Sequence, residues 1–407
     1  MRWGLWFNEI PDEMAEQLKR AGWEDFGREP FRIFFPAGVI VGIIGVALWP
    51  LHFKGVVSFY PGQAHVRLMA YGFFGAFIFG FLGTAMPRML SAKPLGVGNV
   101  AALLGAYVVM VGSYAAGKLV WGDLVLLVLL GLFLMMIAPR AMKRKDTPPP
   151  GFVLVGLAWV CVAAGAVIAV LQSRVELDLF WINLQKLLSS QGFVLLPILG
   201  IGPFLLPRFF GMESPHDFPE MRTPSGVWLK KALLALTVGM VIIASFVWEA
   251  QGGFTGAHAV RFAACLVYLA LEFPFRKAPK FANALGASLH IAFVTLLAGL
   301  LLVALFPAYR VGLLHLTLVG GFAVITFVVA TRVVFGHSGN IGRLKSGNKW
   351  LVGAVGLMLF GMATRISGDF WPKIMASHYM YGSLLWAAGV TWWSIKVLPK
   401  VLLVEEE

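Results

Sequence analysis

The chain has little charge for its length of 407 residues. Asp, Glu, Lys and Arg together make up 13% of it, whereas a soluble domain carries about 25% charged residues. This shortage excludes a globular protein whose whole surface faces water. Disorder is excluded as well, because 14% of the residues are aromatic. The class that remains is a polytopic helical membrane protein.

Cysteine is also scarce. Cys161 and Cys265 are the only two, and each lies inside an apolar run. The CxxCH pattern that attaches c-type haem is absent, and so is any CxxC pair for zinc or an iron–sulfur cluster. The first apolar run follows about thirty amphipathic residues, so no cleavable signal peptide is expected.

Long hydrophobic runs dominate what is present, and hydrophobic residues make up 59% of the chain. A spanning helix needs about 20 mainly apolar residues. The sequence therefore predicts an all-α fold with about twelve transmembrane helices and short connections. The twelve predicted spans are 31–50, 64–87, 98–117, 120–138, 152–172, 184–206, 229–248, 257–274, 282–306, 311–334, 350–367 and 376–396. The twelfth has polar residues at both ends, and no internal repeat is evident.

The net charge of +13 reflects membrane orientation, and no nucleic-acid partner is expected. If the N-terminus is cytoplasmic, all but nine of the 33 Lys and Arg residues fall in cytoplasmic segments. We therefore expect a membrane protein with both termini in the cytoplasm. Residues 1–29 are predicted to form an amphipathic cytoplasmic segment, 30–398 the transmembrane domain and 399–407 a cytoplasmic tail.

Histidines are the most informative polar residues, because an imidazole in hydrocarbon needs a partner, water or a metal. His65 begins the second span, His315 lies four residues into the tenth, and His378 is near the outer start of the twelfth. A common depth on three helices suits a haem iron or copper held between them. Alternatively, histidines at helix ends hydrogen-bond to water or headgroups, which is the favoured interpretation for His52 and His258.

A second polar site is predicted in the cytoplasmic half. His337 follows His315 by 22 residues, a separation of about 33 Å along a helix, so the two cannot share a metal ion. His290 lies about nine residues from the cytoplasmic end of the ninth span, closer in depth to His337. We expect His290 and His337 to form a separate polar or metal site.

Two arginines are candidates for binding the anionic propionates of a haem. Arg67 follows His65 by two residues, and Arg310 precedes His315 by five. Arg365 and Asp369 are four residues apart, on one helix face. The alternative for these residues is ordinary snorkelling of the side chain to the interface.

Several motifs resemble those of the NnrS family. The run from His315 to Gly339, with Gly320-Gly321 and Gly336-His337-Ser338-Gly339, is similar to the family signature. Leu289-His290, the run His65–Pro87 and Glu29-Pro30-Phe31-Arg32 resemble further family motifs. In the second span, however, Arg67 stands where the family has a second histidine. The arginine of a Gly-Gly-Arg motif is likewise missing from Gly202–Pro207.

The resemblance implies a haem- and copper-containing bacterial inner-membrane protein associated with nitric oxide and nitrosative stress. A more distant likeness is to the core of haem-copper oxidases and nitric oxide reductases, whose copper ligands are histidines in helices 6 and 7. The segments 184–206 and 229–248 contain no histidine. An oxidase-type binuclear centre is therefore not expected.

The leading interpretation is a b-type haem protein that handles nitric oxide or iron-nitrosyl species, with copper as a further cofactor. His65 and His315 are the expected axial ligands, with His378 as the substitute, and Arg67 and Arg310 the expected propionate partners. The sequence leaves open both the electron donor and an enzymatic, oxidoreductase role. One alternative is a permease for a small solute or metal ion. Another is a cofactor-free assembly protein that docks through its first thirty residues.

Overall fold

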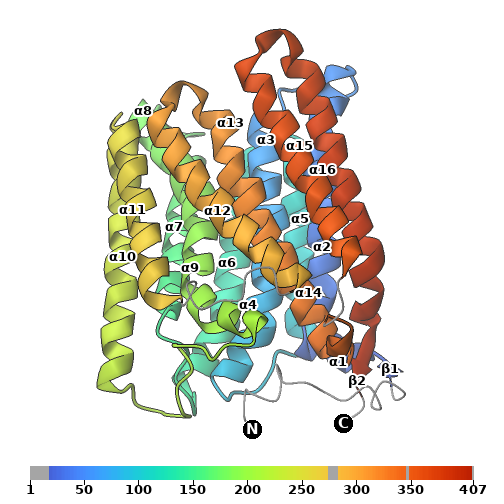
Figure 1. Ribbon diagram of the computed structural model, residues 1–407, viewed down its shortest axis with the longest axis vertical. Helices are drawn as coiled ribbons and strands as arrows, with labels where there is room; N and C mark the ends of the chain where they lie inside the picture. Colours follow the sequence, from blue (N-terminus) through green and yellow to red (C-terminus); the bar gives the residue numbers. More distant parts are fainter. Residues whose placement is uncertain (1–17, 274–282, 345–347, 406–407) are drawn as a thin grey trace.

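Most of the described chain is helical, in a bundle whose helices run along the long axis (Figure 1). The computed structural model describes residues 18–273, 283–344 and 348–405. Within them, eleven helical segments are long and apolar enough to cross a membrane, which confirms the polytopic all-α class. These are Phe31–Phe53, Gly62–Met89, Val97–Ala115, Leu119–Met142, Phe152–Leu171, Leu179–Phe210, Gly226–Ala250, Phe254–Glu272, Ala284–Leu305, Pro307–His337 and Lys349–Phe370.

Eight of these spans are single α-helices: α2 (Phe31–Phe53), α5 (Val97–Ala115), α6 (Leu119–Met142), α7 (Phe152–Leu171), α10 (Gly226–Ala250), α11 (Phe254–Glu272), α12 (Ala284–Leu305) and α15 (Lys349–Phe370). The other three are composite. The second contains α3 (Gly62–Arg67), η3 (Leu68–Phe74) and α4 (Gly75–Met89). The sixth contains α8 (Leu179–Leu187), η4 (Leu188–Gly192), α9 (Phe193–Leu205) and η5 (Leu206–Phe210). The tenth contains η7 (Pro307–Tyr309), α13 (Arg310–His315), η8 (Leu316–Ala323) and α14 (Val324–His337).

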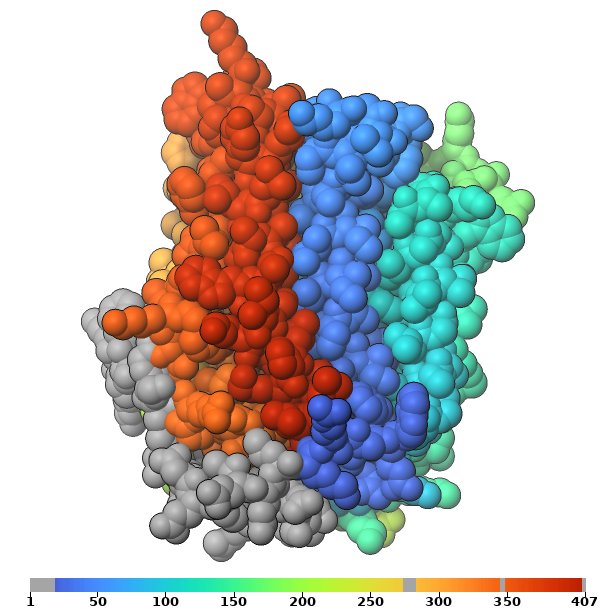
Figure 2. All heavy atoms as spheres, turned by 90° about the vertical axis from the view of Figure 1, so that its right-hand side faces the viewer, coloured from blue at the N-terminus to red at the C-terminus, as the bar shows by residue number. Residues whose placement is uncertain are grey.

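The twelfth predicted span, 376–396, forms the helix α16 (Met375–Val397). It is not among the eleven segments, but it runs beside them along the bundle (Figure 1). It packs against α15 and α2, so the C-terminal and N-terminal spans lie side by side (Figure 2). Trp393 is fully buried and donates its indole N–H to Thr331 of α14 at 2.8 Å. The helix is therefore an integral part of the bundle.

The two ends of the described chain meet in a small sheet. The strand β1 (Leu18–Arg20) pairs antiparallel with β2 (Leu403–Glu405) at one end of the bundle (Figure 1). Both ends thus lie on the same side, as an even number of crossings requires. Of the predicted amphipathic segment, residues 1–17 lie outside the described residues, and the short helix α1 (Trp23–Arg28) follows β1.

Each of the three composite spans contains a π-helical segment, namely η3, η4 and η8. They occur in the second, sixth and tenth spans, so the feature recurs every fourth span although the sequence shows no repeat. A π-helical turn shifts the helix register and is found frequently at functional sites. These segments therefore indicate where a site lies.

A buried ion pair joins the second span to the fourth. Arg67 donates through Nε and Nη2 to the carboxylate of Asp123 at 2.9–3.1 Å. Tyr114 of α5 donates its hydroxyl to the same carboxylate at 2.9 Å. Arg67 and Asp123 are 7% and 1% exposed. A buried charge without its partner is strongly destabilising, so this pair fixes how α3, α5 and α6 meet.

A second network, centred on Glu29, closes the end where the strands pair. Arg32 donates to Glu29 at 2.7 Å, the ring Nδ1 of His337 lies 2.6 Å from it, and Arg88 pairs with it as well. Burial alone would raise the pKa of Glu29. The adjacent His337, Arg32 and Arg88 lower the pKa by more than burial raises it, so it lies well below its usual value. Glu29 thus ties α2, α4 and α14 together as a carboxylate.

We predict that Asp123→Asn destabilises the protein by about 3–5 kcal/mol, because it leaves the Arg67 guanidinium buried without a counter-charge. Unfolding in detergent, followed by circular dichroism, measures this loss. The control is Glu24→Gln, which breaks the exposed pair with Arg28 and should cost less than about 0.5 kcal/mol. Equal stability of the two variants would contradict the structural role of the Arg67–Asp123 pair.

We also predict that Glu29 stabilises the fold at neutral pH and ceases to do so in acid. Its folded-state pKa lies below the ordinary value of 4.5, so the stabilisation is present above that pH and is lost as the pH falls. The difference in melting temperature between wild type and Glu29→Gln should therefore shrink below about pH 4.5. A difference that stays constant or grows with acidification would refute the prediction.

Candidate cofactor site

A cavity of about 440 Å³ lies in the half of the bundle away from the paired strands. Its size is within the range of about 300–1,000 Å³ typical of small-molecule sites. All three π-helical segments contribute to its wall, through Met69 and Phe74 of η3, Gln191 of η4 and Leu318 of η8. The cavity thus forms where the second, sixth and tenth spans converge.

His65 and His315, the pair predicted from spacing, line this same cavity. The Nδ1 of His65 lies 2.9 Å from the carbonyl oxygen of Gly45, and that of His315 lies 2.8 Å from the carbonyl of Val311. A carbonyl only accepts, so each Nδ1 carries the proton and each Nε2 is left with its lone pair. Neither Nε2 has a hydrogen-bond partner among the described residues. Metal-ligating histidines are held in this way, with one nitrogen anchored and the other available.

The sequence explains how the tenth span reaches the cavity. His315 is the last residue of α13 and directly precedes η8. A Cβ at Gly321 would lie 2.8 Å from the Cβ of Leu296, and one at Gly299 would lie 2.3 Å from the hydroxyl of Thr317. Only glycine allows so close an approach of η8 to α12. The glycine pair after His315 therefore fixes the depth and position of that imidazole.

Three cationic side chains line the cavity. Arg310 and Lys186 line it, and neither has a carboxylate partner in the part of the chain that the structure describes. The guanidinium of Arg310 lies over the ring of Phe254 at 4.6 Å. Arg365 lines the cavity too, but is paired with Asp369 at 2.6 Å. Arg310 and Lys186 are thus available to an anion. Lys186 was not selected as a site residue from the sequence, where it lies near the start of the predicted span 184–206.

Two predicted residues lie elsewhere. Arg67 does not line the cavity, because its guanidinium is committed to Asp123. The prediction that it binds a propionate is therefore not supported, and the reason is a partner 56 residues away in the sequence. His378 does not line the cavity either; its Nδ1 lies 3.0 Å from the carbonyl of Ile374, the residue that precedes its helix α16. Of the two, only His315 shares the cavity with His65.

The structure does not join the predicted second pair, His290 and His337. His337 contacts Glu29 and Arg88, whereas His290 bonds to the carbonyl of Gly286 at 2.9 Å and packs edge-on against Phe210. Among the described residues, no group of three or more His, Cys, Asp or Glu could hold a metal ion. The prediction paired these histidines because they lie at similar depths in the membrane. Depth along a helix does not determine which neighbouring helix a side chain faces.

A buried polar cluster on the cavity wall was missed. His258 and Glu249 line the cavity, with His258 Nε2 3.2 Å from Glu249 Oε2. Arg261 donates to Glu249 and to Gln191, both at 2.8 Å. The Nδ1 of His258 is buried without a partner among the described residues. The sequence did carry a signal: His258 and Arg261 lie three residues apart, on one face of an apolar helix.

Comparison with known proteins agrees with this architecture. No curated protein matches the chain. A family model described as NnrS protein matches residues 25–403, which includes every span and the whole cavity wall. The match covers the motifs around His65, His290 and His315 together with the network at Glu29. The chain therefore belongs to the NnrS family of polytopic membrane proteins.

Proposed function

We propose that this protein binds b-type haem in the bacterial inner membrane and acts in nitric oxide metabolism or the response to nitrosative stress. One observation carries the proposal: two imidazoles with anchored Nδ1 and available Nε2 atoms, His65 and His315, line one cavity of about 440 Å³. Membership of the NnrS family fits a role related to nitric oxide. The positive-inside bias supports cytoplasmic termini.

The cavity suits an apolar macrocycle that bears two carboxylates. Its wall is largely apolar, with Phe74, Val303, Leu318 and Trp386 among the lining side chains. Arg310 and Lys186 supply the cationic side. An amphipathic anion would therefore place its apolar body among the aromatic and aliphatic residues and its carboxylates beside these cations. We assign Arg310 and Lys186 as the propionate partners.

The residues of this chain hold and orient the cofactor. The backbone carbonyls of Gly45 and Val311 keep both imidazoles protonated on Nδ1, so that the Nε2 atoms of His65 and His315 are presented as ligands. Bound haem would supply an iron that coordinates nitric oxide or transfers single electrons. Glu249 and His258 add a polar pair to the wall of the same cavity. Copper is implied by the family, and we assign it no residues here.

The permease alternative receives less support. On the side of the paired strands, aromatic rings fill the space between the second, tenth and twelfth spans. Phe73 lies 5.6 Å from Phe327 and 5.6 Å from Trp386, and Phe77 lies 5.8 Å from Phe327, between ring centroids. Such packing offers no polar partners to a hydrated solute. The residues that the assembly-protein alternative invokes lie mostly outside the described ranges.

We predict that His65→Ala and His315→Ala each abolish or strongly reduce haem binding, because each removes an axial ligand. The absorption spectrum and the haem content of the purified protein measure this. His378→Ala is the matched control: that imidazole is anchored on a carbonyl four residues back, as His315 is, but lies outside the cavity wall. A folded wild type without a Soret band, or equal loss in the control, would overturn the assignment.

We further predict that Arg310→Gln and Lys186→Gln each weaken haem retention. A hydrogen bond to a charged group contributes about 1.5–3 kcal/mol, which corresponds to roughly a tenfold or greater change in affinity. The rate of haem transfer to a soluble acceptor protein measures retention. Arg174→Gln, at an exposed position outside the cavity wall, is the control. Retention that is unchanged in both cavity variants would exclude these residues as propionate partners.

A further inference from the structure

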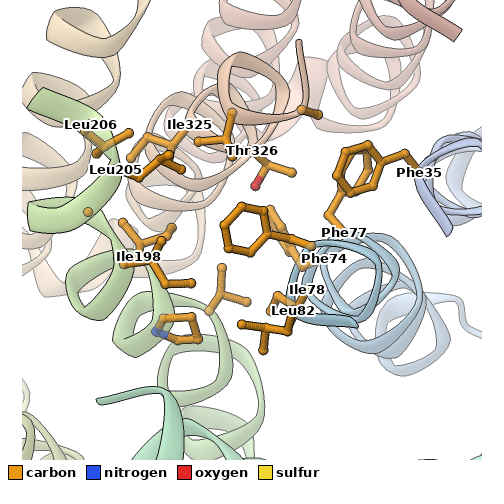
Figure 3. Close-up of a pocket in the computed structure, with 17 residues that line it drawn as sticks. Phe35, Phe74, Phe77, Ile78, Leu82, Ile198, Leu205, Leu206, Ile325 and Thr326 are labelled. Carbon is orange, nitrogen blue, oxygen red and sulfur yellow. The ribbon is translucent and has the colours of Figure 1, made fainter. Parts of the chain in front are cut away.

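A second, smaller pocket lies between α4, α9 and α14 (Figure 3). Its volume is about 90 Å³, and 17 residues line it. Thr326 is the only one with a polar side chain, and its hydroxyl donates to the carbonyl of Phe322 at 2.8 Å. The lining side chains therefore offer no unused hydrogen-bond donor to the pocket.

The apolar lining determines which kind of molecule the pocket can hold. A water molecule needs two to four polar partners to remain in a cavity, and apolar cavities instead stay dry and take up apolar molecules such as xenon. Several lining residues, including Ile78, Ile198 and Val329, are only partly buried. A small apolar molecule dissolved in the lipid can therefore reach contact with the walls of the pocket.

Phe74 lies between the pocket and the cofactor cavity, because it lines both. It is the last residue of the π-helical segment η3 and is 5% exposed. Its ring packs against Phe73 at 4.7 Å and meets Phe322 edge-on at 6.2 Å. Figure 3 shows Phe74 among the side chains that face the pocket. One aromatic ring thus stands at the boundary between an apolar pocket and a cationic cavity.

We propose that this apolar pocket binds a small, uncharged, apolar molecule, the class to which dissolved diatomic gases belong, and that Phe74 controls its passage to the cofactor cavity. The binding step is independent of the haem assignment. The passage step rests on the proposed function, in which nitric oxide reaches a haem between His65 and His315. A neutral gas gains nothing from the cations at the cavity, so an apolar approach through the lipid side is the favourable one.

Xenon is the probe for the binding step, and xenon NMR on the detergent-purified protein measures its affinity. Ile198→Phe and Val329→Phe fill the pocket from α9 and α14 and should weaken xenon binding roughly tenfold or more, because the added ring occupies the space. Val160→Phe is the matched control, since it adds the same ring at a position that is 63% exposed on α7. Thermal melting identifies any variant that does not fold, and the two filling variants lie on different helices.

Absence of saturable xenon binding in the wild type, or unchanged binding in a folded filling variant, would overturn the pocket assignment. The passage step is tested on haem-loaded protein by flash photolysis with nitric oxide. Phe74→Ala should raise the association rate several-fold and Ile198→Phe should lower it. Because Phe74 also lines the cofactor cavity, the haem spectrum of each variant is recorded beside the rate and shows whether the haem site itself has changed. Equal rates in all variants would refute the gating role of Phe74. If no haem binds, the proposed function fails, while the xenon result still decides whether the pocket binds a gas.

Discussion

The need to satisfy every polar group in a hydrocarbon environment governs this structure. Arg67 is permitted in a spanning helix because Asp123 and Tyr114 meet it, and Arg261 because Glu249, Gln191 and Ser245 do. Four groups on the wall of one cavity are not matched in this way by the described residues: the Nε2 atoms of His65 and His315 have no hydrogen-bond partner, and Arg310 and Lys186 have no carboxylate partner. The cofactor proposal follows from their position on the same cavity.

Much of the fold was predictable from hydropathy, because a bilayer imposes the length of each helix. The span expected at 64–87 is observed as Gly62–Met89, and the least apolar one, 376–396, as Met375–Val397. Residue counting also predicted a common depth for His65 and His315, and both residues line one cavity. Residue counting did not predict which neighbouring helix each side chain contacts. Arg67 pairs with Asp123 of α6, and His290 and His337 contact different neighbours. Which helix faces which depends on packing between distant segments.

π-helical turns recur in every fourth span, the second, sixth and tenth, although the sequence shows no internal repeat. A π-helical turn has no characteristic residue pattern, so similar backbone geometry can persist after the side chains have diverged. Each turn directs side chains of its span onto the same cavity: Phe74 at the end of η3, Gln191 in η4 and Ala323 at the end of η8. Residues of all three π-helical segments thus line the cavity, and Phe74 of η3 also lines the apolar pocket.

The way in which Arg32 is satisfied has a consequence for biosynthesis. Its buried guanidinium donates to the carbonyls of Val401 and Leu403, at 2.7 Å each, some 370 residues later in the chain. During translation, the first span enters the bilayer long before these acceptors exist. Until they are synthesised, Glu29 is the only one of these partners that can pair with the Arg32 guanidinium. The N-terminal end of the bundle therefore reaches its final arrangement only after the last residues have been synthesised. A chain truncated before Val401 would lack these two acceptors, and Arg32 of the first spanning helix would remain without them.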